Sequence, residues 1–409
     1  MSGKWPGGFI TKTEPTVVGP VDGEGGSAPG IWTLGEVADY EKQGLWPKPL
    51  LDAELYAWGN NTSGQLGDGT TAYRYSPVQV GALTTWLNIS SGYSSTIAIK
   101  TDGTLWTWGN NAQGQLGDGT TVNKSSPVQV GALTTWSQSA AGQSHSLVTT
   151  TDGKLYSFGQ NNYGQLGQGN TTNYSSPVQV GALTTWLNLA AGYSHSIAVK
   201  TDGTIWAWGR GSTPFGGGGQ LGLGDTTNRS SPVQIGALTT WSKAACGNYF
   251  SLAITTDGKL YAWGWGTQGE LGQGNTTSYS SPVQVGALTT WADVAAGNLH
   301  ALATTTDGKL YAWGYNGDGQ LGQGNTTSYS SPVQVGALTT WSKITGGRTF
   351  SAALKTDGTL WTWGNNNAGQ LGQGDTTGRS SPVQVGALTT WRIISKGVNG
   401  YQVLAITKT

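Results

Sequence analysis

The stretch KLYAWGYNGDGQLGQGNTTSYSSPVQVGAL, from Lys309 to Leu338, is followed by TTW, a short AxG-type segment and a TDG turn, and this pattern recurs along most of the chain. Its WG marker, which is FG in one copy, is spaced by 50 residues, apart from one spacing of 55. Seven copies of a β-rich unit of this length predict a β-propeller with one blade per copy. The aromatic residues of the marker are Trp58, Trp108, Phe158, Trp208, Trp263, Trp313 and Trp363.

Each unit contains four short segments that are typical of strands. In one copy they are WSKAACG (241–247), FSLAIT (250–255), KLYAWG (259–264) and SPVQVGAL (281–288). The second and third are joined by TDG, in which Asp-Gly supplies the positive φ angles of a tight hairpin. The proline of the fourth segment favours an outer edge, because proline cannot donate a hydrogen bond to a neighbouring strand.

The two ends of the repeat array predict how the ring closes. The first copy starts at ELYAWG (54–59) and has only the third and fourth strands, whereas the last copy ends at YQVLAITKT (401–409) with only the first and second. One blade must therefore combine both ends of the chain, which leaves no free strand edge. We predict an all-β fold: a seven-bladed propeller of four-stranded blades over residues 51–409, preceded by an arm over residues 1–50.

The composition excludes several classes of protein. Lys and Arg together number 21, as do Asp and Glu, so the formal net charge is zero and only 10% of residues are charged. Such a balance offers no basic surface for nucleic acid or for an anionic membrane. One cysteine, Cys246, excludes an intramolecular disulfide. Thirteen of the 20 tryptophans occupy the TTW and WG positions of the repeat, where we expect them to fill the core between blades.

Residues 1–50 contain no repeat, no signal-peptide pattern and no apolar run long enough to span a bilayer. Thr33 and Glu36 form a capping box that predicts one short helix, which ends at Gly44 and Pro47. A helix of about ten residues is unstable alone, so we expect its apolar side to dock on a partner surface. The candidate docking residues are Trp32, Leu34, Val37, Tyr40, Leu45 and Trp46.

The segment GYSHSIAVKTDGTIWAWG (192–209), followed by GQLGLG (219–224), resembles the repeat of the regulator-of-chromosome-condensation family. The resemblance covers about 85% of the chain and implies a seven-bladed propeller. Members of that family include nuclear exchange factors for a small GTPase, a plant ultraviolet sensor and a secreted β-lactamase inhibitor, so the resemblance implies a fold rather than one function. The GWRHT cluster of the sensor is missing from this sequence.

A second resemblance concerns APGIWTLGEVADYEKQGLWP (28–47), which is similar to a connector segment in structural proteins of marine bacteriophages. It covers about 20 residues. It implies that the arm attaches the propeller to a virus particle.

The sequence contains no recognisable catalytic or cofactor-binding constellation. His145, His195 and His300 occupy one slot of the repeat, one per blade, and are predicted to form structural hydrogen bonds rather than a metal site. Cys246 stands where three sister copies have alanine, which indicates a small buried residue. The TDG aspartates form turns, and GQLGxG lacks the lysine of a phosphate-binding loop. We therefore expect no enzyme activity, no cofactor and no metal.

The copies differ mainly in two sets of loops. In a four-stranded meander the loops between the first and second strands and between the third and fourth strands emerge on one face, here called the variable face. The opposite face, here called the constant face, carries TDG and QVGALTTW almost unchanged. Aromatic residues among Ser, Asn and Gly are typical of adaptable binding surfaces, although drift in unconstrained loops also explains the variation. The candidate binding residues are Tyr93, Tyr163, Tyr193, Pro214, Phe215, Tyr249, Trp265, Tyr315 and Arg348.

Two functional hypotheses follow. The first is a non-enzymatic virion structural protein of a tailed bacteriophage, displayed as a host-binding adhesin or decoration. In this hypothesis the arm binds other virion proteins and the propeller binds a host-surface glycan or protein. The hypothesis is compatible with a homo-oligomer within the particle. The alternative is a cytoplasmic, regulatory protein–protein interaction propeller of the regulator-of-chromosome-condensation type. Neither hypothesis involves nucleic acid or insertion into a membrane.

Overall fold

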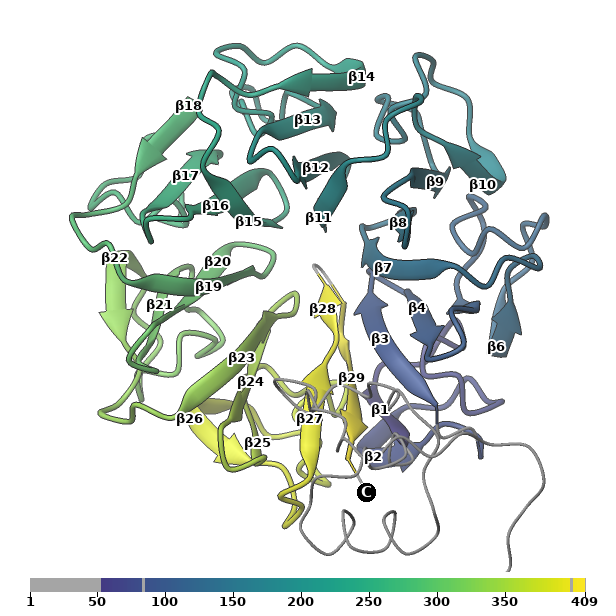
Figure 1. Ribbon diagram of the computed structural model, residues 1–409. Helices are drawn as coiled ribbons and strands as arrows, with labels where there is room; N and C mark the ends of the chain where they lie inside the picture. The colour runs from purple at the N-terminus through teal and green to yellow at the C-terminus, as the bar shows by residue number, and fades with distance from the viewer. Residues whose placement is uncertain (1–52, 83–84, 398–399, 409) are drawn as a thin grey trace, which may run out of the picture. The chain divides into compact units, whose positions relative to one another are not determined.

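The computed structural model describes residues 53–82, 85–397 and 400–408. These residues form seven β-sheets, each built on four antiparallel strands, arranged as the blades of a propeller around a central axis (Figure 1), which confirms the predicted fold class. The predicted helix with its docking residues, from Trp32 to Trp46, and the boundary near residue 50 lie outside the described residues.

Six blades are each built from four consecutive strands, with the first strand innermost (Figure 1). In order along the chain, blades 1 to 3 contain β3 (Trp86–Ser91), β4 (Ser95–Lys100), β5 (Leu105–Gly109) and β6 (Lys124–Gln129); β7 (Trp136–Ala141), β8 (His145–Thr150), β9 (Leu155–Gly159) and β10 (Tyr174–Gln179); and β11 (Trp186–Ala191), β12 (His195–Lys200), β13 (Ile205–Gly209) and β14 (Arg229–Gln234). Blades 4 to 6 contain β15 (Trp241–Cys246), β16 (Phe250–Thr255), β17 (Leu260–Gly264) and β18 (Tyr279–Gln284); β19 (Trp291–Ala296), β20 (His300–Thr305), β21 (Leu310–Gly314) and β22 (Tyr329–Gln334); and β23 (Trp341–Gly346), β24 (Phe350–Lys355), β25 (Leu360–Gly364) and β26 (Arg379–Gln384).

Blade 7 combines both ends of the array, as the sequence predicts. Its strands, from the inside outward, are β27 (Trp391–Ile394), β29 (Gln402–Thr407), β1 (Leu55–Gly59) and β2 (Arg74–Gln79). Strands β1 and β29 pair in an antiparallel register that joins Leu55 to Ile406 and Gly59 to Gln402. The ring is therefore closed by backbone hydrogen bonds between the first and the last strand.

A second contact closes the ring on its inner side. The short strand β28 (Lys396–Gly397) leaves blade 7 and pairs in parallel with β3 of blade 1. The Ser91 hydroxyl donates to the Ser395 hydroxyl at 3.2 Å, and the Gln402 side-chain amide donates to the Gly92 carbonyl at 2.9 Å. Blade 7 is thus fastened to blade 1 by its backbone and its side chains.

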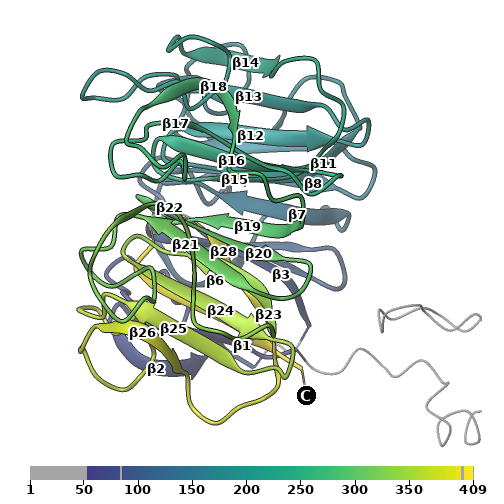
Figure 2. The same ribbon diagram turned by 90° about the vertical axis from the view of Figure 1, so that its left-hand side faces the viewer.

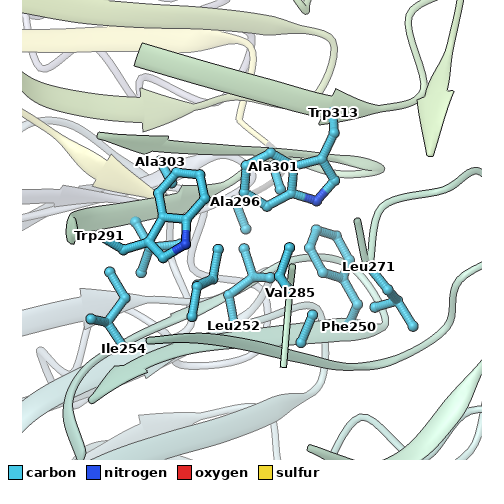
Figure 3. Packing of buried hydrophobic residues seen from close by; sticks show 13 residues of the cluster. Phe250, Leu252, Ile254, Leu271, Val285, Trp291, Ala296, Ala301, Ala303 and Trp313 are labelled. Carbon is cyan, nitrogen blue, oxygen red and sulfur yellow. The ribbon is translucent and has the colours of Figure 1, made fainter. Parts of the chain in front are cut away.

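The core lies between neighbouring blades rather than inside one sheet. Figure 3 shows one such layer, in which Trp291 and Trp313 of blade 5 pack against Leu252, Ile254 and Val285 of blade 4. Each WG tryptophan also donates its indole N–H to a glutamine or glutamate backbone carbonyl of the preceding blade, at 2.8–3.0 Å. The repeated tryptophans therefore bind the blades to one another, as expected from their spacing.

The loops divide between two faces, seen edge-on in Figure 2. On the constant face, the turn after the second strand bonds to the segment that enters the first strand: Thr101 N–H donates to Thr85 C=O at 2.9 Å. Exposed leucines of the repeated GALTT segment also lie here, each 44–48% exposed. The described ranges contain no helix long and apolar enough to cross a lipid bilayer.

Candidate functional site

The loops between the first and second strands surround the central axis on the variable face. They line a cavity of about 230 Å³. The lining residues are Tyr93, Gln143, Tyr193, Asn248, Asn298 and Arg348, which occupy equivalent positions in blades 1 to 6. Only one of them is charged, and the buried side-chain oxygens of Asn248 and Asn298 have no hydrogen-bond partner in the part of the chain that the structure describes. Below this opening the axis is lined mainly by alanines of the innermost strands, and Cys246 is among them.

An aromatic cluster with one arginine lies beside this opening, on blades 2 to 4. The rings of Tyr193 and Tyr249 lie 5.4 Å apart. The guanidinium carbon of Arg210 lies 4.5 Å from the centre of the Tyr163 ring and 5.9 Å from that of Tyr249. Such contacts between a cation and aromatic rings hold the arginine in place at a low cost in entropy.

The five-residue insertion of blade 3 forms a small hairpin next to this cluster. Ser212 pairs with Gly218, and Thr213 N–H donates to Gly217 C=O at 3.0 Å. The turn uses positive φ angles at Gly216 and Gly217, where a glycine avoids the strain of a side chain. The tip presents Phe215, which is 78% exposed and lies 6.2 Å from the ring of Trp265 in blade 4. The predicted apolar tip is therefore present, and it is held by hydrogen bonds.

A second arginine cluster spans the closure between blades 6, 7 and 1. Arg348 Nη1 donates to the Tyr93 hydroxyl at 3.2 Å, and its guanidinium carbon lies 5.2 Å from the Tyr401 ring. The rings of Tyr93 and Tyr401 meet edge to face at 6.4 Å. The variable face thus carries two arginines, each packed on two tyrosines.

The structure brings most of the predicted binding residues together, with one correction. Tyr249 was expected to be exposed, but only 8% of it is, because Tyr193 and Arg210 cover its ring. Tyr315 is half-buried in blade 5 and makes no aromatic contact among the described residues. Pro214 is exposed at the hairpin tip. Gln143 and Arg210 belong to the variable loops but are not among the candidate binding residues, and the sequence prediction missed Asn248, Asn298 and Tyr401.

The three histidines make hydrogen bonds between blades. His145 Nε2 lies 3.0 Å from Ser196 Oγ of the next blade, and His195 and His300 make the same contact with Ser251 and Ser351. Burial lowers the pKa of His145 to about 4 and that of the other two to about 3.

Cys246 is also buried, and its burial raises the pKa of the thiol. In the described residues no group of three or more His, Cys, Asp or Glu side chains lies close enough together to hold a metal.

Blade 4 carries a buried acid where the other blades have glutamine. Glu270 Oε2 accepts from Gln268 N–H at 2.7 Å, but the buried Oε1 has no partner among the residues that the structure describes. Burial raises the pKa of Glu270 from 4.5 to about 7. The folded state thus retains the proton at pH values where the unfolded state releases it, so stability is lost as the pH rises from about 4.5 to about 7.

Replacing this acid by the residue of the sister blades is expected to remove that loss. The variant Glu270→Gln should unfold with a free energy higher by about 3 kcal/mol at most near pH 8, and be equal to the parent near pH 4.5. Denaturant unfolding at the two pH values measures the difference. Equal stabilities near pH 8 would mean that the carboxylate is ionised at no cost in the folded state.

Comparison with known proteins agrees with this geometry. A family model for the RCC1-like domain matches residues 50–292 and 185–409. The structure of human WBSCR16 has a TM-score of 0.78 at 23% identity, with 87% of this chain and 99% of that protein aligned. The structure of Prp20p from Saccharomyces cerevisiae has a TM-score of 0.77 at 20% identity, with 88% and 92% aligned. A structure of Kap60 bound to yeast RCC1 (Prp20) aligns at a TM-score of 0.76 and 17% identity over 100% of this chain and 96% of that chain. The chain belongs to the family of RCC1-like domains.

Proposed function

We propose that this chain is a non-enzymatic, protein-binding propeller that holds its partner on the variable face. Membership of the RCC1-like family supports a binding role, since the structural report on Prp20p concerns its binding to Gsp1p and histones, and another structure has the same protein bound to Kap60. The constant face repeats one sequence, whereas the variable face gathers different aromatic and polar side chains around one opening. Selective recognition of one partner requires such a difference between blades.

The observation that carries the proposal is the Phe215 hairpin. Six sister blades close without this insertion, so the blade itself does not need it. Two backbone hydrogen bonds and the Trp265 ring fix the hairpin so that its apolar tip is exposed to solvent. Exposing a large apolar side chain brings no stability to the fold. An exposed aromatic residue on a hydrogen-bonded hairpin is a typical anchor of a protein interface.

A photo-crosslinking amino acid placed at position 215 tests the proposal in the organism that encodes the protein. We expect a discrete crosslinked adduct with one protein, which mass spectrometry identifies. The variant Phe215→Ala should bind the purified partner about thirtyfold more weakly, since an interface anchor contributes roughly 2 kcal/mol. Circular dichroism checks that the variant keeps its fold.

The matched control is Leu388, an exposed apolar residue of the constant face. Crosslinker at position 388 should give no adduct, and Leu388→Ala should leave the affinity unchanged. Adducts at position 388 together with none at position 215 would place the partner on the constant face and contradict the proposal.

A virion role is a narrower hypothesis that rests on residues 28–47. None of the similarities to known proteins supports the bacteriophage connector, and these residues lie outside the described part of the chain. The virion location, the arm as an attachment segment and a host-surface ligand therefore stay predictions from the sequence, as does the cytoplasmic alternative. The identity of the protein crosslinked at position 215 separates the two hypotheses, because a capsid or tail protein, or a host-surface protein, would favour the virion.

A further inference from the structure

A paired asparagine and glutamine stabilise the loop after the third strand in three adjacent blades. In blade 7 the Gln65 side-chain amide donates to Asn60 Oδ1 at 2.6 Å, where Asn60 directly follows the WG marker. Blades 1 and 6 make the same bond at 2.7 and 2.9 Å. In all three blades the glutamine oxygen accepts a backbone N–H of its own loop. The Asn–Gln pair thus satisfies its buried polar groups within the blade.

The four remaining blades, which are contiguous, have lost this pair. Their residues after the marker are Gln160, Arg210, Trp265 and Tyr315. In blades 2 to 4 a buried polar atom of the glutamine or glutamate at the second position of the pair has no hydrogen-bond partner among the described residues. These atoms are Gln165 Nε2, Gln220 Oε1 and Glu270 Oε1.

Each unsatisfied buried polar group destabilises the fold, by roughly 1–3 kcal/mol. Blades 6, 7 and 1 keep the Asn–Gln hydrogen bond, and blades that depart from such a shared pattern are expected at functional sites. We call the part of the variable face on blades 2 to 5 the unpaired arc. It contains the Phe215 hairpin and the cluster of Tyr163, Tyr193, Arg210 and Tyr249.

Arg210 lies in the middle of this arc, and no described residue supplies a counter-charge to it. Its guanidinium makes no hydrogen bond or ion pair to any described residue, and its Nε is buried. The arginines that begin fourth strands behave differently: Arg74, Arg229 and Arg379 each pair with an aspartate, at 2.6, 2.6 and 2.7 Å. A half-buried cation with unused donors is costly unless an anion completes the site.

We propose that Arg210 binds a side-chain carboxylate of the partner protein, presented by a segment whose neighbouring residues are apolar and pack on Phe215 and Trp265. This inference rests on the proposed function and names the chemistry that the variable face recognises. Arginine presents a planar pair of donors that matches the two oxygens of a carboxylate. One cation suits one negative charge, whereas a doubly charged phosphate is normally bound by several cations.

The stacking of Arg210 prepares it for this role. The Tyr163 and Tyr249 rings pack on the guanidinium without using its hydrogen-bond donors, so these stay available for the ligand. Since the side chain is already ordered, binding immobilises little more of it. Arg348 is a weaker candidate, because one of its donors already bonds to the Tyr93 hydroxyl.

The test is selection of a library of short random displayed peptides on the immobilised full-length protein. We expect the selected peptides to contain Asp or Glu beside large apolar residues, and to bind about thirtyfold more weakly to Arg210→Met. Arg210→Lys keeps the charge but not the planar donors, so it should recover only part of the affinity. The matched control is Arg229→Met, which removes an arginine of the same blade that is already paired with Asp225 and should leave the affinity unchanged.

A double variant supplies an independent readout. Trp265→Asn with Glu270→Gln recreates in blade 4 the Asn–Gln pair of blades 6, 7 and 1. It should raise the melting temperature and weaken peptide binding, whereas a purely structural role of the arc predicts higher stability with unchanged binding.

Selected peptides without acidic residues, peptides that bind Arg210→Met as tightly as the parent, or the absence of any selected peptide would each overturn the inference. None of these results affects the crosslink at position 215. The proposed function therefore stands or fails separately from the role of Arg210.

Discussion

Deleting residues 400–409 is expected to lower the melting temperature by roughly 10 °C or more, because it removes the strand that closes the ring. Strand β29 lies between β27 and β1, so its loss removes two of the three strand pairings of blade 7. Val403, Leu404 and Ile406 are fully buried against the neighbouring blades. Removing three such side chains and two strand pairings costs on the order of 10 kcal/mol. Differential scanning calorimetry measures the change.

Two controls separate ring closure from simple shortening of the chain. Deleting residues 1–10 removes the same number of residues but no described strand, and should leave the melting temperature unchanged. The second control is a circular permutant of the propeller. In it Thr407 is linked to Glu54 by a Thr-Asp-Gly turn like that of the other blades, and the new chain ends lie between residues 183 and 184. It should melt as high as the propeller of residues 53–409, because all strand pairings remain. A truncated protein that melts like the intact one would contradict the closure argument.

The closure could be predicted from the sequence because both ends of the array are incomplete. The strand residues alternate between apolar and polar, and the copies are nearly identical, so each strand can be assigned its place in a blade. The first copy lacks a second strand and the last copy lacks a third, so the partner of Leu55–Gly59 follows by elimination. Strand β28 could not be predicted. Its two residues show no periodicity, and its parallel pairing with β3 depends on where the last copy crosses to blade 1.

The candidate site was predicted in part. The meander determines which loops share a face, and therefore the sequence alone brings Tyr93, Tyr193 and Arg348 to one opening. The sequence does not determine how much of each side chain is exposed to solvent. The candidate binding residues include both Tyr193 and Tyr249, but aligning the preceding glycines, Gly192 and Gly247, shows that Tyr249 stands one residue later in its loop.

A usable signal for the unpaired arc was present in the sequence. The residue after the marker is asparagine in three adjacent blades and changes to Gln, Arg, Trp and Tyr in the other four. Its meaning becomes clear only with the hydrogen bonds, because the glutamine that completes the pair lies five residues further along the chain. The hydrogen bonding of the histidines was likewise predicted as a kind of contact, but the serine partners of the next blade were not.

Those histidines give the second large effect, a loss of stability in acid. Ser196 Oγ donates its proton to the Gln165 carbonyl at 2.8 Å, so it accepts from His145 Nε2–H, and the same geometry holds for His195 and His300. Each ring therefore carries a proton on Nε2, and its buried Nδ1 has no hydrogen-bond partner among the described residues. Because the folded pKa values are depressed to about 4 and about 3 by burial, the unfolded state binds protons first as the pH falls below 6.5. Stability is thus present above about pH 6.5 and is lost below it.

As the pH falls through this range, the three histidines lower the free energy of unfolding by about 4 kcal/mol per pH unit. Glu270 acts with the opposite sign and offsets about a third of this loss. The replacement residue is phenylalanine, since Phe250 and Phe350 occupy the same slot in blades 4 and 6 and pack on equivalent glycines. We expect the triple variant His145→Phe, His195→Phe and His300→Phe to be less stable than the parent near pH 7.5 by about 1 kcal/mol per lost hydrogen bond. Near pH 5 the order should reverse, because the parent then bears the cost of three uncharged histidines that the unfolded chain would protonate. Urea unfolding at the two pH values gives both free energies, and equal losses for parent and variant would show that other groups control the acid sensitivity.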